Sequence, residues 1–362
     1  MAPSQLPKLP PLTVPHRLAT EGIVVGVDIG GTKQTVAAAQ LDGTLVALRR
    51  RRLRAGGTAQ DVVAGICEMI DAVLAESAQR RTGVAQASQA VGAGHAGPAG
   101  PAGHKVLRIG IGFGGPVDQK RGVVLTSHHV PGWDGFPLRS VMEGRYDVPA
   151  ILDNDANAAA LGELLFGAGR GQHNLLYVNV GTGIGAGVIV NGALYHGEHG
   201  MAGELGHVTV EPDGPVCACG KRGCLEAVAS GRSFGRRARE AAARDPAAGA
   251  AIIAEAGGNP RAIEGPHVMA AAAKGDALAR RLIAELAEYL GRALGNAANL
   301  LDPGMIVVGG GLSEAGDALF GPLAERVKAH LLPSLPAPRV VPAALGYDAG
   351  IAGAIALALD EL

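Results

Sequence analysis

Three clustered cysteines, Cys217, Cys219 and Cys224, and the upstream His207 are the residues whose chemistry is clearest in this chain. Three thiolates and one imidazole are a ligand set typical of tetrahedral zinc, and four protein ligands without an open position describe a structural site. Two alternatives are a reduced thiol loop at the surface and a redox pair, because C-x-C spacing is less diagnostic than paired C-x-x-C spacing. The sequence favours a zinc loop.

Two carboxylates lie beside these predicted ligands. Glu204 precedes His207, and Glu226 follows Cys224. A metal bound to the loop would fix the direction in which both carboxylates point. We therefore expect the loop to present polar side chains to a ligand.

Three glycine-rich turns follow apolar runs of strand length. The first contains Gly30, Gly31, Thr32 and Lys33 after Asp28, the second contains Thr182 and Gly183, and the third contains Gly310 and Gly311. Such glycines bring backbone N–H groups close to a phosphate, a hydroxyl and an ammonium group add to them, and the upstream aspartate can hold Mg²⁺ through water. Each turn alone is equally consistent with a plain hairpin. Together they indicate a nucleotide held in a cleft between two domains.

Asp155 is a further candidate, because it lies where an apolar run ends and a helical pattern begins. Ligands of α/β proteins bind at the carboxyl ends of strands. The alternative is that Asp155 caps the helix, since aspartate and asparagine are preferred N-cap residues. Asp153 could also cap the helix or face inward.

Strand-length apolar runs alternate with helical patterns, which indicates an α/β protein. We expect strands over 23–29, 34–40, 45–53, 106–113, 123–127, 149–155, 174–181, 186–192, 305–311 and 339–345, and helices over 58–79, 138–146, 156–169, from 276 onward and over 351–359. The clearest helix places Leu278, Leu282, Leu286, Leu290 and Leu294 on one face. The two halves share a layout, a strand hairpin around a glycine turn that carries a threonine.

Composition argues against several classes of protein. Charged residues are 18% of the chain and the formal net charge is −1, so no basic field that binds nucleic acid is present. Arg49–Arg52 and Arg54 are interpreted as a solvated strand edge rather than a DNA contact. Four cysteines, with Cys67 isolated, make no disulfide framework and favour a reducing compartment. With no signal peptide or membrane span in the sequence, we expect a soluble, cytoplasmic protein.

Two segments lack a core pattern. Residues 1–21 are rich in proline and are predicted to form a flexible tail. Residues 83–105 are rich in glycine and alanine, and we interpret them as a disordered surface insertion.

Nearly all of residues 22–360 outside this insertion resemble the ROK family of bacterial sugar kinases and repressors, and above all its ATP-dependent glucokinases. The resemblance rests on VGVDIGGTK, GIGFGGPVD, PGWDGFPL, DNDANAAALGE, NVGTGIGAGVIVNG, GELGHVTV, CACGKRGCLE and IVVGGGLSEAGD, in this order. It implies an actin-like (ribonuclease-H-like) two-domain ATPase fold that closes on ATP and a hexose. Residues 22–154 and 340–362 would form a small domain, and residues 155–339 a large domain with the zinc loop.

The resemblance also implies roles for single residues. Asp155 matches the general base for the 6-hydroxyl of the sugar. Sugar-binding positions are matched by Gly115, Asn154, Glu204, His207 and Glu226, and zinc ligands by His207, Cys217, Cys219 and Cys224. The phosphate and Mg²⁺ region is matched by Asp28, Gly30, Gly31, Thr32, Lys33, Thr182 and Gly183, and the adenosine side by Gly310 and Gly311. One ring nitrogen of His207 can bind the metal while the other donates to the sugar.

The chain departs from the family pattern at His128 and His129, where the family usually has a proline and an asparagine. If His129 replaces a sugar-contacting asparagine, the pocket changes in size and hydrogen bonding, and its affinity can depend on pH. The alternative is that both histidines lie on a surface loop.

We therefore expect a glucokinase that uses ATP and Mg²⁺ to make glucose 6-phosphate, with a structural Zn²⁺. Alternatives are a kinase for mannose, fructose or an N-acetylhexosamine, polyphosphate as donor, an inert sugar- or zinc-binding protein, and a sugar-responsive transcriptional regulator. Too few residues precede Ile23 for the helix-turn-helix domain that such a regulator needs. The resemblance also implies a homodimer or homotetramer, with the helices after residue 276 as a candidate interface.

Overall fold

The computed structural model describes residues 6, 9–10, 22–53, 56–89, 105–127 and 130–360, without the side chains of 81–89. Its contacts divide the chain into two units. The first unit comprises Met1–Gly167, Gly197–Gly200 and Asp348–Leu362, and the second comprises Ala168–His196 and Met201–Tyr347. From the sequence we expect domain boundaries at 154/155 and 339/340, and this division stays a prediction.

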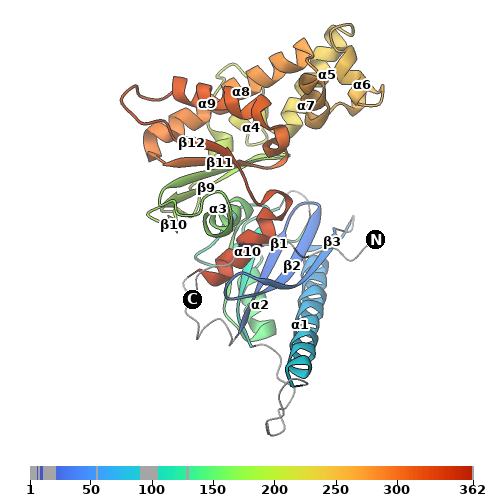
Figure 1. Cartoon of the computed structure of the whole chain (residues 1–362), viewed down its shortest axis with the longest axis vertical. Coiled ribbons are helices and arrows are strands. Elements are labelled where there is room, and N and C mark those ends of the chain that lie inside the picture. Colours follow the sequence, from blue (N-terminus) through green and yellow to red (C-terminus); the bar gives the residue numbers. More distant parts are fainter. Residues whose placement is uncertain are drawn as a thin grey trace. The chain divides into compact units, whose positions relative to one another are not determined.

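The first unit is built on a five-stranded mixed sheet (Figure 1). In sheet order the strands are β3 (Leu45–Arg52), β2 (Lys33–Gln40), β1 (Ile23–Ile29), β4 (Val106–Phe113) and β7 (Ala150–Asn154). The pairs β3–β2 and β2–β1 are antiparallel, whereas β1–β4 and β4–β7 are parallel. Because parallel strands end at the same edge, the turn after β1 and the end of β7 lie at one edge of this sheet.

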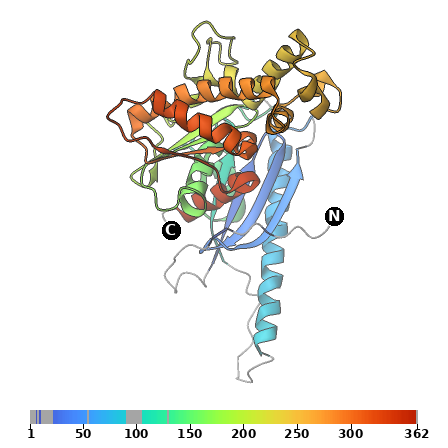
Figure 2. The same ribbon diagram turned by 45° about the horizontal axis from the view of Figure 1, so that its top comes forward.

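Helices cover this sheet. They are α1 (Ala59–Gln89), α2 (Leu138–Tyr146), α3 (Asp155–Phe166) and α10 (Ala349–Leu359), with the small hairpin β5 (Val117–Asp118) and β6 (Val123–Val124) and a 3₁₀ helix, Gly346–Asp348, before α10. Helix α1 lies along the sheet and extends beyond its end (Figure 2). Val27 and Ile111 share an apolar cluster with Ile66 of α1. Since side chains alternate between the faces of a sheet, the residues next to them face the other way.

Small residues bring α10 close to that other face. A Cβ atom at Gly26 would lie 2.8 Å from the Ile355 side chain, and one at Gly110 would lie 2.0 Å from the Ala354 carbonyl oxygen. Helices α3 and α10 also approach closely, because a Cβ at Gly353 would lie 2.3 Å from the backbone of Ala158. The absence of side chains at these positions therefore sets the depth at which both helices pack.

The second unit repeats the layout of the first. Its sheet has the order β10 (Ala193–Leu194), β9 (Ile184–Val190), β8 (Leu175–Val180), β11 (Met305–Gly309) and β12 (Arg339–Pro342). As in the first sheet, two antiparallel pairs are followed by two parallel pairs. The hairpin β8–β9 corresponds to β1–β2, so the glycine turns of the two halves occupy equivalent places.

The helices of the second unit follow its first three strands. They are α4 (Leu225–Ala229), α5 (Gly231–Arg244), α6 (Ala250–Glu255), α7 (Gly265–Ala273), α8 (Ala277–Leu301) and α9 (Asp317–Ala329), with 3₁₀ helices Leu205–His207, Pro260–Ala262 and Gly311–Ala315. Asp276 caps α8 by accepting a hydrogen bond from the Ala279 N–H at 2.7 Å. The predicted leucine face of α8 is buried in one core cluster with Val178 and Ile306 of the sheet.

Most predicted elements are present, with corrections. Helix α1 was predicted to end near Gln79, but it continues to Gln89, so residues 83–89 of the expected insertion are helical. The remainder of that insertion, 90–104, and most of the predicted tail lie outside the described residues. Strand β3 is an edge strand, and Arg49 and Arg51 pair with Glu76 and Glu68. Among the helices described, none is long and apolar enough to cross a membrane.

Gly110→Ala tests the close packing of α10 on the sheet. The new methyl group would collide with backbone atoms of α10, and overpacking of this kind costs about 1–3 kcal/mol. Chemical denaturation should therefore show a lower free energy of unfolding. Gly144→Ala is the matched control, because nothing lies within 4 Å of a Cβ there and alanine favours its helix. Equal stability of the two variants would contradict the packing described.

Candidate active site

Asp155 is the first residue of α3 and directly follows β7. The neighbouring Asn154 caps the helix, because its side chain accepts a hydrogen bond from the Ala156 N–H at 2.9 Å. Asp153 is buried and accepts from the Asn154 N–H at 2.7 Å and from the Asn157 side chain at 2.9 Å. The alternative that Asp155 is the N-cap is therefore wrong, and its carboxylate is not used as the cap.

The environment of Asp155 favours the protonated acid. Burial, and next the negative charge of Asp28, raise the pKa of Asp155 to about 7, although hydrogen bonds from the Ala156 N–H and others oppose the shift. Burial likewise raises the pKa of Asp28 to about 6, against the attraction of Lys33 and Arg50. A carboxylate that titrates near neutral pH is suited to accept a proton.

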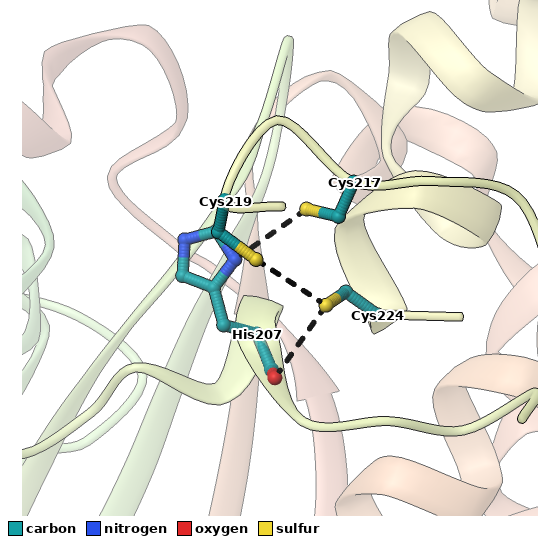
Figure 3. Close-up of side chains that lie close together, drawn as sticks. All are labelled: His207, Cys217, Cys219 and Cys224. Carbon is teal, nitrogen blue, oxygen red and sulfur yellow. Dashed lines mark hydrogen bonds between the residues drawn. The ribbon is translucent and has the colours of Figure 1, made fainter. Parts of the chain in front are cut away.

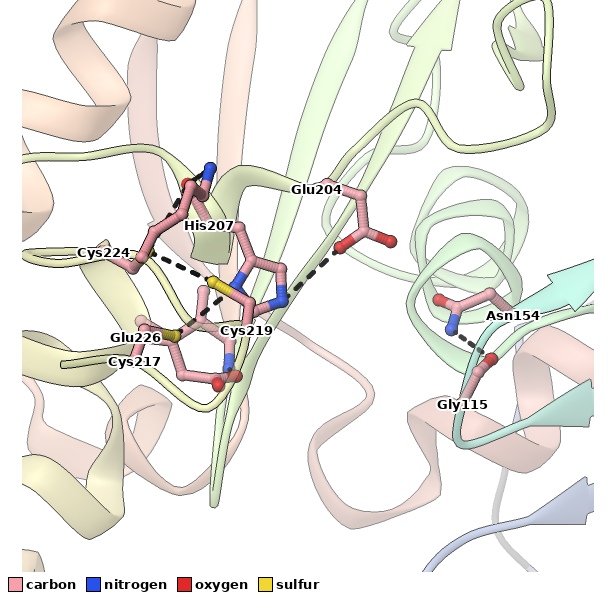
Figure 4. Close-up of polar contacts among 10 residues, drawn as sticks. Gly115, Asn154, Glu204, His207, Cys217, Cys219, Cys224 and Glu226 are labelled. Atoms are coloured by element: carbon pink, nitrogen blue, oxygen red, sulfur yellow. Dashed lines mark hydrogen bonds and ion pairs between the residues drawn. The ribbon is translucent and has the colours of Figure 1, made fainter. Parts of the chain in front are cut away.

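Glycines keep the space around Asp155 free of side chains. A Cβ at Gly114 would lie 3.3 Å from Oδ2 of Asp155 and 3.4 Å from the Cα of Gly30. The N–H of Gly114 donates to the Ile29 carbonyl at 2.8 Å, which fastens this turn to the end of β1. The side chain of Asn154 donates to the Gly115 carbonyl at 3.0 Å (Figure 4). The structure thus brings Gly30, Gly115, Asn154 and Asp155 to one edge of the first sheet.

The turn between β1 and β2 carries the other polar groups of this edge. The Gly30 N–H donates to the Lys33 carbonyl at 3.0 Å, and Gly31 and Thr32 are exposed. Asp28 is buried, and its carboxylate lies 2.7 Å from the place of a Cβ on Gly350. Only glycine at position 350 leaves room for this carboxylate beneath the turn.

The predicted metal ligands converge in the second unit. One ligand atom each from His207, Cys217, Cys219 and Cys224 lies within 4.8 Å of all the others (Figure 3). Nδ1 of His207 is 3.7 Å from Sγ of Cys217, and the Sγ atoms of Cys219 and Cys224 are 3.6 Å apart. In a tetrahedral zinc site two sulfurs are about 3.8 Å apart, and a sulfur and a nitrogen about 3.6 Å, from the usual bond lengths. The four ligands therefore fit Zn²⁺.

The thiols of this cluster differ in their environments. Burial raises the pKa of Cys224 to about 12, whereas a hydrogen bond from the Lys221 backbone lowers the pKa of Cys219. Without a cation the Cys224 thiol therefore stays protonated. A bound metal ion supplies the positive charge that favours three thiolates side by side.

Short backbone pairings hold the loop in place. Thr209 pairs with Cys224, and Val216 with Arg222, as isolated antiparallel bridges. His207 ends a 3₁₀ helix and directs Nδ1 at the sulfurs, while its Nε2 lies 3.9 Å from Oε2 of Glu204 (Figure 4). The second ring nitrogen is thus free of the cluster and can meet a ligand.

Glu226 has a partner that the sequence did not reveal. Its Oε2 atom accepts a hydrogen bond from the Ile184 N–H at 2.9 Å. This N–H belongs to the first residue of β9, directly after the glycine turn with Thr182 and Gly183. A residue two positions after a predicted metal ligand is therefore bound to a predicted phosphate-binding turn.

Thr182 and Gly311 line one cavity of about 520 Å³ in the second unit. The cavity also contains residues that the sequence analysis missed, among them Gly231, Arg232, Glu264, Gly265 and Pro266. Gly231 and Gly265 begin α5 and α7, and helix N-termini favour anions. The signals that could have found them were these two helix starts.

Gly310 adopts φ +80°, and a Cβ there would lie 2.5 Å from the Val180 carbonyl oxygen.

The structure does not describe the two histidines at which the sequence departs from the family pattern. His128 and His129 lie outside the described residues, so the proposed replacement of a sugar-contacting asparagine stays a prediction.

The chain has relatives among proteins of known structure and activity. A model of the ROK family matches residues 97–361. The glucokinase of Streptomyces coelicolor is 34% identical over 341 residues, which are 94% of this chain and 98% of that protein. A putative xylose repressor of Caldicellulosiruptor is 28% identical over 345 residues, 94% of this chain and 79% of the repressor.

A solved structure is similar over nearly the whole chain. It is a ROK family glucokinase from Streptomyces griseus in complex with glucose and AMPPNP. The TM-score is 0.74 at 36% sequence identity, and the match covers 93% of this chain and 99% of that chain.

Asp155→Asn tests the raised pKa through stability. A carboxyl whose pKa rises on folding destabilises the folded state increasingly as the pH rises from about 4 to about 7. Asparagine removes this cost, so the melting temperature of the variant relative to wild type should be higher at pH 8 than at pH 4.5. At pH 8 the free energy of unfolding of the variant should exceed that of the wild type by roughly 2 kcal/mol, allowing for the partial exposure of the side chain. A difference that is the same at both pH values would contradict the assignment.

The metal cluster makes a separate prediction. Elemental analysis of the purified protein should find about one zinc per chain, and Cys219→Ser should lower that content. Cys67→Ser is the matched control, because Cys67 lies outside the cluster and should leave the zinc content unchanged. Undiminished zinc in the Cys219 variant would show that the cluster is not the site.

Proposed function

Since the chain belongs to the ROK family, we propose that it is an ATP-dependent glucokinase, which transfers the γ-phosphoryl group of ATP to the 6-hydroxyl of glucose. The glucokinases described above support glucose as acceptor and ATP as donor. The observation that carries the proposal is the Asp155 carboxylate, which has a pKa of about 7, is not used as the helix cap, and lies beside the unobstructed Gly114.

Asp155 is proposed as the general base. It orients the 6-hydroxyl of the sugar and accepts its proton as the bond to phosphorus forms, so the reactive form is the carboxylate. Phosphoryl transfer depends mainly on positioning and on neutralising charge, and little on covalent help. A single well-placed carboxylate with a pKa near the working pH is sufficient for this step.

The glycine turns are proposed to bind the nucleotide. In the first unit Gly30, Gly31, Thr32 and Lys33 offer N–H groups, a hydroxyl and an ammonium group to phosphates. In the second unit Thr182 and Gly183 offer N–H groups and a hydroxyl, and the cavity lined by Thr182 and Gly311 is proposed to hold the adenosine. Asp28 would hold Mg²⁺ through water, and this ion would neutralise phosphate charge. The buried Asp28 carboxylate, whose pKa is raised, fits a cation.

The metal loop is proposed to orient groups for the sugar. Asn154 and Gly115 of the first unit, and Glu204, His207 and Glu226 of the second, are the proposed ligands of its hydroxyls. The zinc ion would fix the tautomer of His207, so that its Nε2 can donate to the sugar while Nδ1 faces the sulfurs.

The two mixed sheets of equal strand order support an actin-like fold. The closure of its two domains on the substrates and the zinc loop in the larger domain are part of the proposal. Residues 22–154 with 340–362, and 155–339, remain the proposed domains. A cytoplasmic location stays a prediction from the cysteine content. A homodimer or homotetramer stays a prediction from the resemblance.

A sugar-responsive transcriptional regulator is the second candidate, because a putative repressor matches over 94% of this chain. A regulator would bind operator DNA and release it with sugar, without net phosphoryl transfer. A gel-shift assay beside a coupled kinase assay separates the two.

The base is tested by Asp155→Asn. Asparagine keeps the size of the side chain but cannot accept the proton, so kcat should fall by roughly 10²–10⁴-fold or more, while glucose binding measured by calorimetry is retained. Asp276→Asn is the matched control, because asparagine caps a helix as well as aspartate does. If Asp155→Asn phosphorylates glucose at nearly the wild-type rate, the base is another residue.

Sugar specificity is tested with a panel of glucose, mannose, fructose and N-acetylhexosamines at saturating ATP and Mg²⁺. Glucose should give the highest kcat/KM. A higher value for another hexose would replace the proposed substrate and leave the kinase assignment in place.

A further inference from the structure

Glu226 lies against the glycine turn between β8 and β9. Its Oε2 atom accepts the Ile184 N–H at 2.9 Å, and a Cβ at Gly183 would lie 2.5 Å from the same oxygen. The carboxylate thus occupies the space that any side chain at position 183 would need. Only glycine at this position lets the turn and the carboxylate meet.

Two further contacts hold the same turn. A Cβ at Gly206 would lie 2.3 Å from the Ile184 carbonyl oxygen, so the 3₁₀ helix that ends at His207 packs directly on the start of β9. The Gly231 N–H donates to the Gly181 carbonyl at 2.8 Å, which joins the turn to the start of α5. The backbone of the turn is therefore held at Gly181 and at Ile184.

Both contacts at Ile184 start next to predicted metal ligands. Gly206 is adjacent to His207. Glu226 is in the first turn of α4, whose N-cap is Cys224. Only Leu225 separates Cys224 from Glu226, so a shift of Cys224 would move the backbone that carries the Glu226 side chain. A shift of the metal cluster would be passed to the turn through two routes.

We propose that Glu226 is a positioning residue through which the metal loop keeps the Gly181–Ile184 turn in the shape that binds the nucleotide phosphates. The inference rests on the proposed function, because phosphate binding at this turn is part of that proposal. Oε2 serves the turn, and Oε1 remains for a sugar hydroxyl. Metal occupancy then governs the affinity for nucleotide as well as for sugar.

The proposal differs from a role at the sugar alone in one measurable respect. If Glu226 contacts only the sugar, its loss leaves nucleotide binding unchanged when no sugar is present. If Glu226 shapes the turn, nucleotide binding weakens even without sugar. Loss of the hydrogen bond to the Ile184 N–H should therefore weaken nucleotide binding roughly tenfold.

The test uses two measurements without glucose. They compare the wild-type protein before and after chelation of zinc with the variants Glu226→Ala and Glu226→Gln. Hydrogen exchange reports the protection of the Ile184 amide, and calorimetry reports the Kd of ADP with Mg²⁺. Alanine and chelation should each remove the protection and raise the Kd about tenfold. Glutamine should restore both, because its amide oxygen also accepts the Ile184 N–H.

Asp213→Ala is the matched control, an exposed carboxylate of the same loop that should change neither measurement. Wild-type protection and ADP affinity in both Glu226→Ala and the chelated protein would overturn the proposal. Failure of the wild-type protein to bind ADP or phosphorylate glucose would instead overturn the proposed function. The exchange of the Ile184 amide would still decide whether Glu226 shapes the turn.

Discussion

The close packing of α3 and α10 on the first sheet is the constraint on which the candidate site depends. Gly110, Gly162 and Gly353 have no side chains, so backbone lies on backbone where these elements meet. At this depth the first residue of α3 reaches the edge of the sheet where β1 ends. Burial consequently raises the pKa of both Asp155 and Asp28, and the negative charge of Asp28 raises that of Asp155 further. Shallow packing would leave two ordinary acids in water.

The second unit uses a different device for the same purpose. Its loop between β10 and α4 contains little regular structure, and two isolated backbone bridges with four convergent ligands give it form. A loop of this kind has few apolar side chains to hold it, so a bound metal ion would replace the missing core. The carboxylates beside the ligands would then point in fixed directions. Packing positions Asp155, whereas coordination would position Glu226.

Much of this architecture could be predicted from the sequence, because its signals are local. The leucine period of α8, the two hairpins around glycine turns and the cluster of cysteines each lie within a short stretch, and the structure confirms all three. The predicted end of α1 was wrong, because a segment that contains alanine and glutamine is compatible with helix as well as with disorder. The cap of α3 is Asn154, and cap preferences could not separate it from its two acidic neighbours.

The missed features depend on residues that are far apart in the sequence. Asp28 and Asp155 approach each other because β1, β4 and β7 are consecutive parallel strands that end at one edge of the sheet. Arg232 and Glu264 share a cavity because two helix starts meet there, and no motif spans them. The bond from Ile184 to Glu226 needs the fold of the whole loop. Local patterns carry no information on such distances, so the domain boundaries and the sugar-binding set remain proposals.

The equal strand order of the two sheets has an electrostatic consequence. In the hairpin registers the last pairs are Ile29 with Gln34 and Val180 with Ile184, so Asp28 of one half corresponds to Asn179 of the other. An acid in the first half is thus matched by an amide in the second half at the same place in the hairpin. One half then attracts cations, whereas the other offers only dipoles. The repeat of the backbone is therefore not a repeat of the charges, because only the first half carries a carboxylate at this position.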